Sequence, residues 1–531
     1  MEFAMKKRKF HMIASILIAA VFSFCRYDKG EGLLILLLSM ALVFYLFLTI
    51  RSSIGTIKKD SYFLLGMILL LGLSSFITDN KDIQTTNNLG IFLLTSVTVI
   101  HNYYFDNNWS LTKYLGMIVK SFFNIIPLTF LPVKEFRELI NYKKIEQNGD
   151  NAAVAKKETG YYVFVGLVTS IPIVLILVFL LASADAVFGK IVSTIFVEII
   201  DFNITNVFQI VVLFLLGFVL SYSGIRVMEQ KQVPDYDGKN EYFEEVIAIT
   251  VLSVISILYL VFSVIQILYL FIGDFRLPEG YTYAKYAREG FFQLLFVCLL
   301  NLLIVLFVLK HFRRGIITKI LLTVISACTY IMIASSALRM GMYVSEYNLT
   351  RQRVKVFWAL ATLAIIFIFV VINIYKENFR LSRWAMIAFC ICYLVLSFGR
   401  MDAFIARYNL SKLTNEEMEL LDTYGEDYIY FEENYKNREK EYQMELWKKM
   451  DYDLDAMYDE YAGLKSIREL VLSHRYEYTL SADAIPALED TSHIFVLKYK
   501  DENFIKKYGI SDLSFRHLNL SKIMARRYIE N

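Results

Sequence analysis

Long apolar runs alternate with short polar segments over the first 400 residues of the chain. An α-helix needs about 20 apolar residues to cross roughly 30 Å of hydrocarbon, and runs of this kind occur about eleven times. The first and last runs are short, so ten or twelve spans also fit the pattern. The runs cover approximately residues 10–25, 32–50, 61–77, 90–105, 161–183, 206–225, 246–273, 290–310, 317–338, 356–375 and 384–400.

Two further stretches are amphipathic. Residues 109–132 place Lys113, Lys120 and Asn124 among aromatic and aliphatic residues, and residues 187–200 repeat apolar pairs at helical spacing. A helix with one apolar face settles in the interface between lipid and water. We therefore expect both stretches to lie along the membrane surface.

The basic residues 5–9 and the apolar run after them have the layout of a secretory signal peptide. However, Phe24 before Cys25 is too bulky for a cleavage site, and no small-x-small motif precedes it. Further apolar runs follow at once, so we expect a retained first span.

Composition supports a membrane protein. The chain has 531 residues, of which 56% are hydrophobic, 15% aromatic and 20% charged, and its mean hydropathy is +0.46. Soluble domains carry about 25% charged residues. Six prolines and 23 glycines exclude a linker-rich or disordered chain. The sequence thus predicts an all-α integral membrane protein with about 11 transmembrane helices, two interfacial amphipathic helices and a C-terminal soluble helical domain.

Charge divides the chain into unlike parts. Residues 401–531 hold 18 basic and 26 acidic residues, whereas the first 400 hold 37 basic and 26 acidic ones. Neither part shows a basic stripe with interleaved aromatics, so the expected partner is the lipid bilayer and not nucleic acid. The oligomeric state stays open. The predicted domains are an N-terminal four-span region at 1–105, an interfacial helix with a loop at 106–160, a seven-span core at 161–400 and an acidic helical domain at 401–531.

Loop charges predict the orientation, because cytoplasmic loops are rich in Lys and Arg. One alternate set of loops, beginning with the N-terminus, holds 25 of these residues, and the other set holds 11. We therefore expect a bacterial plasma-membrane protein with its N-terminus inside and, for eleven spans, its acidic tail outside. An error of one span would move the tail to the other side.

The tail is rich in tyrosine and in helix-forming residues, notably at 415–422 and 442–450. One interpretation is a small helical domain that packs on aromatic rings. The other is a ligand platform with tyrosine hydroxyls that face acidic groups.

Motifs for catalysis are largely missing from the sequence. It has no Gly-rich phosphate loop, no Gly-x-Ser-x-Gly elbow and no HExxH, and its six histidines are isolated. The five cysteines all lie in apolar runs and are expected to pack, with neither a disulfide framework nor a zinc site. No cofactor and no metal are expected.

Ionisable residues inside membrane spans are the usual marker of a transport path. The predicted spans are nearly free of them. Their polar groups are limited to Gln266, Gln293, Asn301 and Asn373. We expect the first three of these to form hydrogen bonds between helices, each contributing about 0.6–2 kcal/mol.

Charge is concentrated instead in three segments that the loop count places on the outer face. They span Tyr283–Phe292, Tyr343–Arg353 and Asp402–Asn409, and in each an acid and an arginine are close in sequence with aromatic residues beside them. The candidate ligand-binding residues are Arg288, Glu289, Glu346, Arg351, Arg353, Asp402 and Arg407.

Two interpretations of these segments are open. They are interfacial pairs that fix helix ends at the headgroup level, as aromatic belts do. Alternatively, they converge on a polar cup beneath the tail, where arginine forks bind phosphate or carboxylate groups with two hydrogen bonds. An anionic lipid, a wall-precursor headgroup or a peptide carboxylate would suit such a cup.

The same three segments resemble a bacterial membrane-protein family, domain of unknown function 4173, which is close to family 4153. The resemblance rests on the patterns at Tyr283–Phe291, Tyr347–Arg353 and Asp402–Asn409. Two tail patterns, Leu480–Leu488 and Phe515–Ser521, extend it, although Phe515 and His517 depart from the usual aromatic-Arg-x-x-Asn form. The resemblance implies a multi-pass bacterial membrane protein and supplies no catalytic residues.

Three functions remain in order of preference. The first is non-enzymatic surface sensing or ligand binding through the outer-face motifs and the tail. The second is a permease for a small or lipidic molecule. The third is a membrane enzyme for a lipid-linked anionic substrate, with Asp402, Glu346 or Glu289 as acid or base and an arginine as phosphate holder.

Overall fold

The structure is a computed structural model. The structure describes residues 2–138 except 105, 107, 108, 110 and 130, the single residues 178, 181, 185 and 188, and residues 204–230, 243–268, 283–420 except 418, 439–449, 480–485 and 518–530. The predicted span at 161–183, nearly all of the amphipathic stretch at 187–200 and most of the tail tyrosines lie outside these residues.

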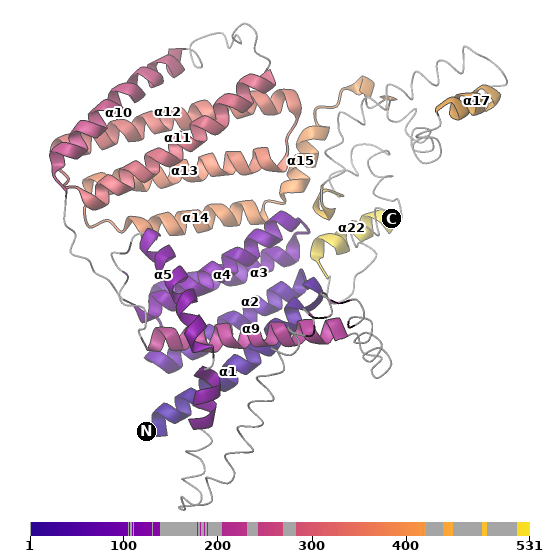
Figure 1. The fold of residues 1–531 in the computed structure, drawn as a ribbon. Coiled ribbons are helices and arrows are strands. Elements are labelled where there is room, and N and C mark those ends of the chain that lie inside the picture. Colours follow the sequence, from indigo (N-terminus) through magenta and orange to yellow (C-terminus); the bar gives the residue numbers. More distant parts are fainter. Residues whose placement is uncertain are drawn as a thin grey trace, which may run out of the picture. The chain divides into compact units, whose positions relative to one another are not determined.

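Helices make up nearly all of the described chain (Figure 1). The N-terminal elements are α1 (Glu2–Arg26), η1 (Tyr27–Lys29), α2 (Leu33–Ile54), α3 (Lys59–Ile77), α4 (Lys81–Tyr103), α5 (Leu111–Ile125), η2 (Ile126–Leu128) and α9 (Ile204–Glu229). The later elements are α10 (Glu245–Gln266), α11 (Tyr283–His311), α12 (Ile316–Tyr347), α13 (Arg351–Tyr375), α14 (Leu381–Phe398), α15 (Met401–Leu410), α17 (Glu439–Lys449), η5 (Ala482–Ala484) and α22 (Leu520–Glu530).

Ten described helices, α1–α4 and α9–α14, are long and apolar enough to cross a membrane. They match ten of the eleven predicted runs and confirm the all-α multi-pass class. A further pair of short helices, Lys113–Leu128 and Leu131–Glu138, is long and apolar enough to cross a membrane only when the two are taken together, and the pair bends by 56° between them. The first of these overlaps α5, which lies in the stretch predicted to rest on the membrane surface; that placement stays a prediction.

The chain divides into two compact units, which are described separately. The first holds residues 1–76, 85–236 and 514–518, and the second holds 77–84, 237–513 and 519–531. The units are not continuous in sequence: the short connection between α3 and α4 belongs to the second unit, although the chain on both sides of it belongs to the first.

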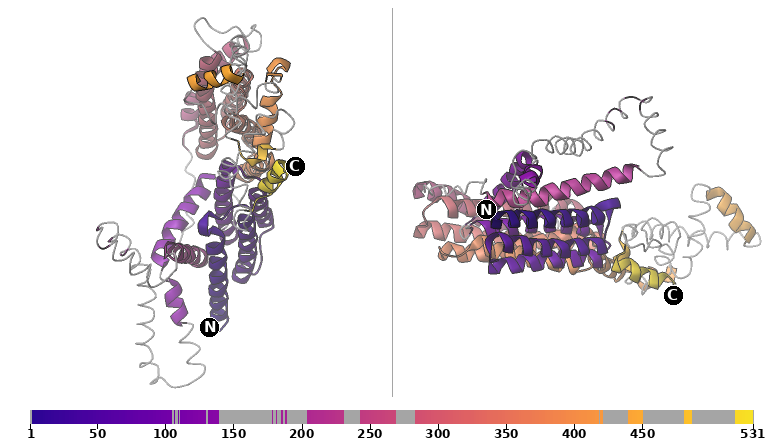
Figure 2. Two further views of the ribbon diagram at one scale, coloured as in Figure 1. Left: turned by 90° about the vertical axis from the view of Figure 1, so that its right-hand side faces the viewer. Right: turned by 90° about the horizontal axis from the view of Figure 1, so that it is seen from below.

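In the first unit, α1 packs against both α2 and α9, and Figure 2 shows these helices side by side. Small residues permit the close approach of helix backbones, as is typical in membranes. A Cβ atom at Gly217 of α9 would lie 3.0 Å from the Phe22 ring of α1. A Cβ at Gly72 of α3 would lie 2.0 Å from Ser39 Oγ of α2, so packing requires a glycine at position 72.

The two ends of this unit can be told apart by polar contacts. At one end, Lys7 of α1 lies 2.8 Å from Glu229, the last residue of α9. At the other end, Ser23 of α1 donates to the carbonyl of Ile210 near the start of α9, at 2.8 Å. Helices α1 and α9 are therefore antiparallel. Since Lys58, just before α3, bonds the carbonyl of His101 near the end of α4, α4 ends on the Lys7 side. The chain consequently changes sides between Tyr103 and Ile204.

In the second unit, α12 is the central helix and contacts α10, α11 and α13. Its 32 residues are about 48 Å long, which exceeds the roughly 30 Å thickness of hydrocarbon. One end of the bundle is marked by Thr318, whose hydroxyl donates to Glu245 at 2.8 Å, and by Arg314, which donates to the carbonyl of Asn373 at 2.7 Å. The other end, where α12 finishes, carries the candidate site.

Candidate functional site

A buried cluster of polar side chains gathers five chain segments at this far end of the second unit. The segments are the connection between α3 and α4, the first turns of α13 and α15, the η5 turn and the start of α22. We call it the carboxylate cluster, and it consists of Thr78, Asp79, Asn80, Arg351, Asp402, Ser481, Asp483, Asn519, Ser521 and Lys522.

Asp402 lies at the centre and is fully buried. Arg351 donates to it twice, from Nε to Oδ1 at 2.7 Å and from Nη2 to Oδ2 at 2.5 Å. The Asn80 amide donates to Oδ1 at 3.1 Å, and Ser481 donates to Oδ2 from its backbone N at 2.9 Å and from its hydroxyl at 2.6 Å. Five hydrogen bonds from three other segments therefore end on one carboxylate, and charge-assisted bonds of this kind are the strong ones.

Local backbone geometry aims Asp402 inward. Helix α14 ends at Phe398, and Arg400 takes a left-handed conformation with φ of 44°, so α15 starts in a new direction. Asp402 stands in the first turn of α15, where unpaired backbone N–H groups and the helix dipole favour an acid.

Asn80 joins the cluster to the start of α4. Its Oδ1 accepts from the backbone N–H groups of Asp82 and Ile83, at 3.0 and 3.2 Å, as a helix N-cap does. Its Nδ2 then remains to bond Asp402. One asparagine thus caps a helix and holds the α15 carboxylate.

Asp483 is the second fully buried acid. Its Oδ2 accepts from the Thr78 hydroxyl and lies 3.3 Å from the Ser481 hydroxyl. Its Oδ1 lies 3.4 Å from the backbone N of Asp79. Burial, followed by the neighbouring Asp402 carboxylate, raises the pKa of Asp483 above its usual range.

A third buried acid, Asp79, lies 3.6 Å from the Lys522 ammonium group. Asn519 of the tail donates to the Thr78 carbonyl at 2.6 Å, beside this pair. The cluster therefore holds three acids and two cations, and most of its contacts join the tail to helix ends.

A second contact ties α15 to the connection between α12 and α13. The Asn409 side chain accepts from the Leu349 backbone N at 2.7 Å and donates to the Leu349 carbonyl at 3.0 Å. Both residues are buried. This pairing satisfies a backbone segment that would otherwise lack partners.

The candidate residues from the sequence separate into four groups. Arg351 and Asp402 meet in the cluster. Arg353 stacks on the Tyr343 ring, 4.1 Å from its centroid, and bonds the carbonyls of Tyr347 and Asn348. Glu346 and Arg407 are exposed on α12 and α15. Arg288 and Glu289 lie on the first turns of α11, and their side chains are outside the described residues.

Sequence reasoning missed the tail half of the cluster. Ser481 and Asp483 lie in the pattern Leu480–Leu488, and Asn519 and Ser521 lie in or beside the pattern that starts at Phe515. In the sequence, only the family resemblance of these two patterns indicates that the residues share a role.

One buried ionisable residue of α12 lies just past the predicted end of its span. Arg339 lies within α12 and is 9% exposed, and its Nη2 donates to Gln266 at 3.1 Å. The Ser335 hydroxyl donates to the same Gln266 oxygen at 2.6 Å. Helix α12 continues to Tyr347, past the predicted end of that span at 338.

The expected hydrogen bonds between helices occur at two of three positions. Gln266 joins α10 to α12 as described. Asn301 of α11 accepts from Tyr259 at 2.6 Å and donates to Thr329 at 2.9 Å. Gln293, by contrast, is exposed.

The first unit holds its own buried ionic network, between α1, α2, α9 and residues 131–138. Glu229 contacts Lys7, Arg226 and the Ser53 hydroxyl, and Arg226 also contacts the buried Glu135. His11, inside the first span, lies 3.7 Å from Glu229. His11 and Glu229 fix helix ends at the Lys7 side.

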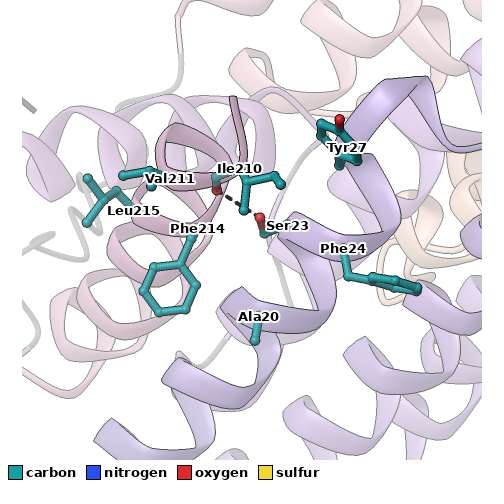
Figure 3. A pocket seen from close by; sticks show the side chains of 8 residues that line it. All are labelled: Ala20, Ser23, Phe24, Tyr27, Ile210, Val211, Phe214 and Leu215. Atoms are coloured by element: carbon teal, nitrogen blue, oxygen red, sulfur yellow. Dashed lines mark hydrogen bonds between the residues drawn. The ribbon is translucent and has the colours of Figure 1, made fainter. Parts of the chain in front are cut away.

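A cavity of about 360 Å³ lies between α1 and α9 (Figure 3). Its lining is apolar apart from the hydroxyls of Ser23 and Tyr27, and Ser23 is bonded to Ile210. It carries no ionisable side chain suited to catalysis. Among the described residues, no group of three His, Cys, Asp or Glu side chains is arranged to hold a metal ion. Four of the five cysteines are buried and all are unbridged, as the packing interpretation requires.

Comparison with known proteins gives one match. A family model described as "Domain of unknown function (DUF4153)" matches residues 65–430, which is more than half of the chain. No curated protein and no solved structure matches. The matched region includes Asn80, Arg351 and Asp402 and stops before the tail residues of the cluster.

Proposed function

Since the chain belongs to the DUF4153 family, we propose a function from its geometry: it is a non-enzymatic, multi-pass membrane sensor whose C-terminal tail docks on helix ends through the carboxylate cluster. The observation that carries the proposal is Asp402, which accepts hydrogen bonds from Arg351, Asn80 and Ser481 at once. In this proposal, a stimulus that changes the docking of the tail is passed on to the membrane helices.

The carboxylate cluster has the properties expected of a contact that lets the tail switch between a docked and a released state. Its tail members, Ser481, Asp483 and Asn519, are separated by long stretches of chain from the helix ends that they bond. Bonds of this type are strong when complete and costly when one partner is missing. A tail held by them is therefore expected to be either docked or released, with few intermediate positions.

The arginines argue against an open anion cup at the same place. The Arg351 fork is filled by Asp402, and Arg353 is occupied by two backbone carbonyls and the Tyr343 ring. An external phosphate would have to displace an internal carboxylate. Among the candidates whose side chains the structure describes, the exposed residues Glu346 and Arg407 are left for contact with a ligand on this side.

Distances between paired spin labels test the docking. The labels are placed on cysteines at Gln352, exposed on α13, and Ile523, exposed on α22, in full-length protein in lipid nanodiscs with the native cysteines replaced. We expect one narrow distance in the parent protein and a second, broader population in Asp402→Asn. Arg407→Gln, on the same helix but exposed, is the matched control and should leave the distance unchanged. A distance in Asp402→Asn identical to that of the parent would contradict the proposal.

The proposed location is a bacterial plasma membrane, with the N-terminus inside and the tail outside. The excess of Lys and Arg in the loops that alternate with the tail supports this orientation. The signal would then come from outside the cell.

A permease is the second candidate, supported by the buried group of Arg339, Gln266 and Ser335. Ionisable residues within spans often mark transport paths. However, Arg339 stands 23 residues after Ile316, about 35 Å along α12, and so near the edge of the hydrocarbon and not at its centre. A cysteine at Ser335 should react with a water-soluble thiol reagent if a path exists, whereas one at the outward-facing Val254 should not. Equal protection of both positions argues against a permease.

A further inference from the structure

We propose that Asp483 is a proton-binding site that is occupied while the tail is docked, so that docking takes up one proton from the compartment that the tail faces. This inference rests on the proposed docking function and adds the chemical identity of one signal, the proton.

The hydrogen-bond inventory around Ser481 carries the argument. A serine hydroxyl has one hydrogen to donate. Ser481 Oγ lies 2.6 Å from Asp402 Oδ2 and 3.3 Å from Asp483 Oδ2, so the shorter contact, to Asp402, takes that hydrogen. If Asp483 is ionised, the longer contact receives only a weak share of that one hydrogen, whereas it becomes a full hydrogen bond when Asp483 is the donor. A neutral carboxyl group supplies that hydrogen, and a carboxylate cannot.

The hydrogen bond from Thr78 is compatible with a protonated Asp483. Its Oγ1 accepts from the backbone N of Asn80 at 3.2 Å, which leaves the hydroxyl hydrogen for Asp483 Oδ2. The protonated oxygen of a carboxyl group accepts one hydrogen bond and donates another. Asp483 Oδ2 can therefore accept from Thr78 and donate to Ser481 at once.

The distribution of charge points the same way. The cluster's charged groups besides Asp483 are Asp402 on α15, Arg351 on α13, Asp79 before α4 and Lys522 on α22. Arg351 is bonded to Asp402, and Lys522 lies beside Asp79. Among the described residues, the groups bonded to Asp483 are neutral: the hydroxyls of Thr78 and Ser481 and the backbone N–H of Asp79.

A buried carboxylate without a cation beside it is strongly disfavoured. Burial, and after it the Asp402 carboxylate, raises the pKa of Asp483 in the docked state. In a released tail the side chain would meet water, where an aspartate has a pKa of about 3.9. The docked state therefore binds the proton more tightly than the released state.

Linkage fixes the direction of the effect. Docking is strongest below the pKa of the released state, and it weakens as pH rises toward the higher pKa of the docked state. Between the two values the docking constant falls by up to about tenfold per pH unit. Rising pH on the tail side is thus the releasing signal.

The spin-label pair at Gln352 and Ile523 tests this when the distance is recorded in nanodiscs between about pH 5 and about pH 8. We expect the docked population of the parent protein to fall as pH rises. Asp483→Asn has the same shape, stays neutral and keeps a donor for Ser481, so its docked population should stay constant. A constant docked population in the parent, or the same pH response in Asp483→Asn, would overturn the proton site while leaving tail docking intact.

The failure of docking itself gives a different result. In that case the parent protein shows no docked population at any pH, or Asp402→Asn matches it throughout. A second measurement does not depend on a variant that docks: the infrared spectrum of the parent protein near neutral pH. We expect absorption from a carboxylic acid that disappears in Asp483→Asn. A spectrum without that difference would contradict the assignment.

Discussion

The guanidinium of Arg351 holds the carboxylate of Asp402 at two points, although 51 residues separate them in the chain. The pair joins the start of α13 to the start of α15 and is 22% exposed on the arginine side and 0% on the aspartate side. It is the contact around which the tail residues assemble.

Replacing Arg351 by Gln should lower the free energy of unfolding by about 3 kcal/mol, because Asp402 then remains buried without its cation. Arg351→Lys should recover only part of this loss, since an ammonium group lacks the planar fork. Equilibrium unfolding in mixed micelles measures both changes. Arg407→Gln is the control and should change the free energy by less than about 0.5 kcal/mol. Equal effects of the two Gln substitutions would show that the pair of Arg351 and Asp402 contributes no more to the free energy of unfolding than an exposed arginine does.

Asn409→Ala should destabilise the connection between α12 and α13. The substitution removes both hydrogen bonds to Leu349 and leaves its buried N–H and carbonyl unpaired, at a cost of about 2 kcal/mol. Hydrogen exchange at the Leu349 amide should accelerate correspondingly. Gln352→Ala, at an exposed position nearby, should leave this amide protected.

In the first unit, Glu229→Gln should lower thermal stability much more than Glu138→Gln. Glu229 is 9% exposed and contacts Lys7, Arg226 and Ser53, whereas Glu138 is 45% exposed and contacts Arg8 at 2.7 Å. Buried pairs are costly to break, and exposed pairs contribute about 0–1 kcal/mol. A comparison of melting temperatures in the same detergent decides the matter; similar values for the two variants would contradict a role for the buried network.

Asp106, between α4 and α5, should make the first unit sensitive to acid. Burial raises the pKa of Asp106, but hydrogen bonds from His101 and Tyr114 outweigh it, so the pKa lies below the ordinary value of 3.8. The stabilisation is therefore present above 3.8 and is lost as pH falls from there through the lowered pKa. Asp106→Asn should be less stable than the parent at neutral pH, and the difference should shrink in acid. Melting temperatures across this range provide the test, and a difference independent of pH would exclude the ionised form as the cause.

Orientation can be measured at the two ends of the second unit. Single cysteines at Arg407, on the tail side, and at Lys376, at the opposite end, are both exposed. In intact cells we expect an impermeant thiol reagent to label the first and spare the second. The reverse pattern would place the tail in the cytoplasm and make the proton signal an internal one.

Hydropathy predicts the described helices well because each span must bury its own backbone polar groups in lipid, which forces long apolar runs. The ten described spans follow from that constraint alone. The extension of α12 to Tyr347 does not, since the residues past 338 are polar enough to read as a loop and are held helical by packing. Arg339 was therefore assigned to a loop.

The candidate site was predictable only in part. Sequence proximity places Asp402 beside Arg407, but the structure pairs Asp402 with Arg351 from another segment. Periodicity within a segment cannot reveal such a partner, because the contact depends on how helix ends converge. Asp483 and Ser481 could not have been chosen from their own surroundings either, since a small-residue turn such as Ser481–Ala484 has no chemical motif.

The unbroken length of α12 has a mechanical consequence. When a helix tilts as a rigid body about one fixed end, its other end is displaced in proportion to its length. The Thr318 end is fixed to Glu245, while Tyr347 lies about 45 Å away, next to the segment that Asn409 holds. A tilt of about 5° would shift that far end by about 4 Å, more than the length of a hydrogen bond. A tilt of α12 would thus be transmitted first to the contact between Leu349 and Asn409 on α15.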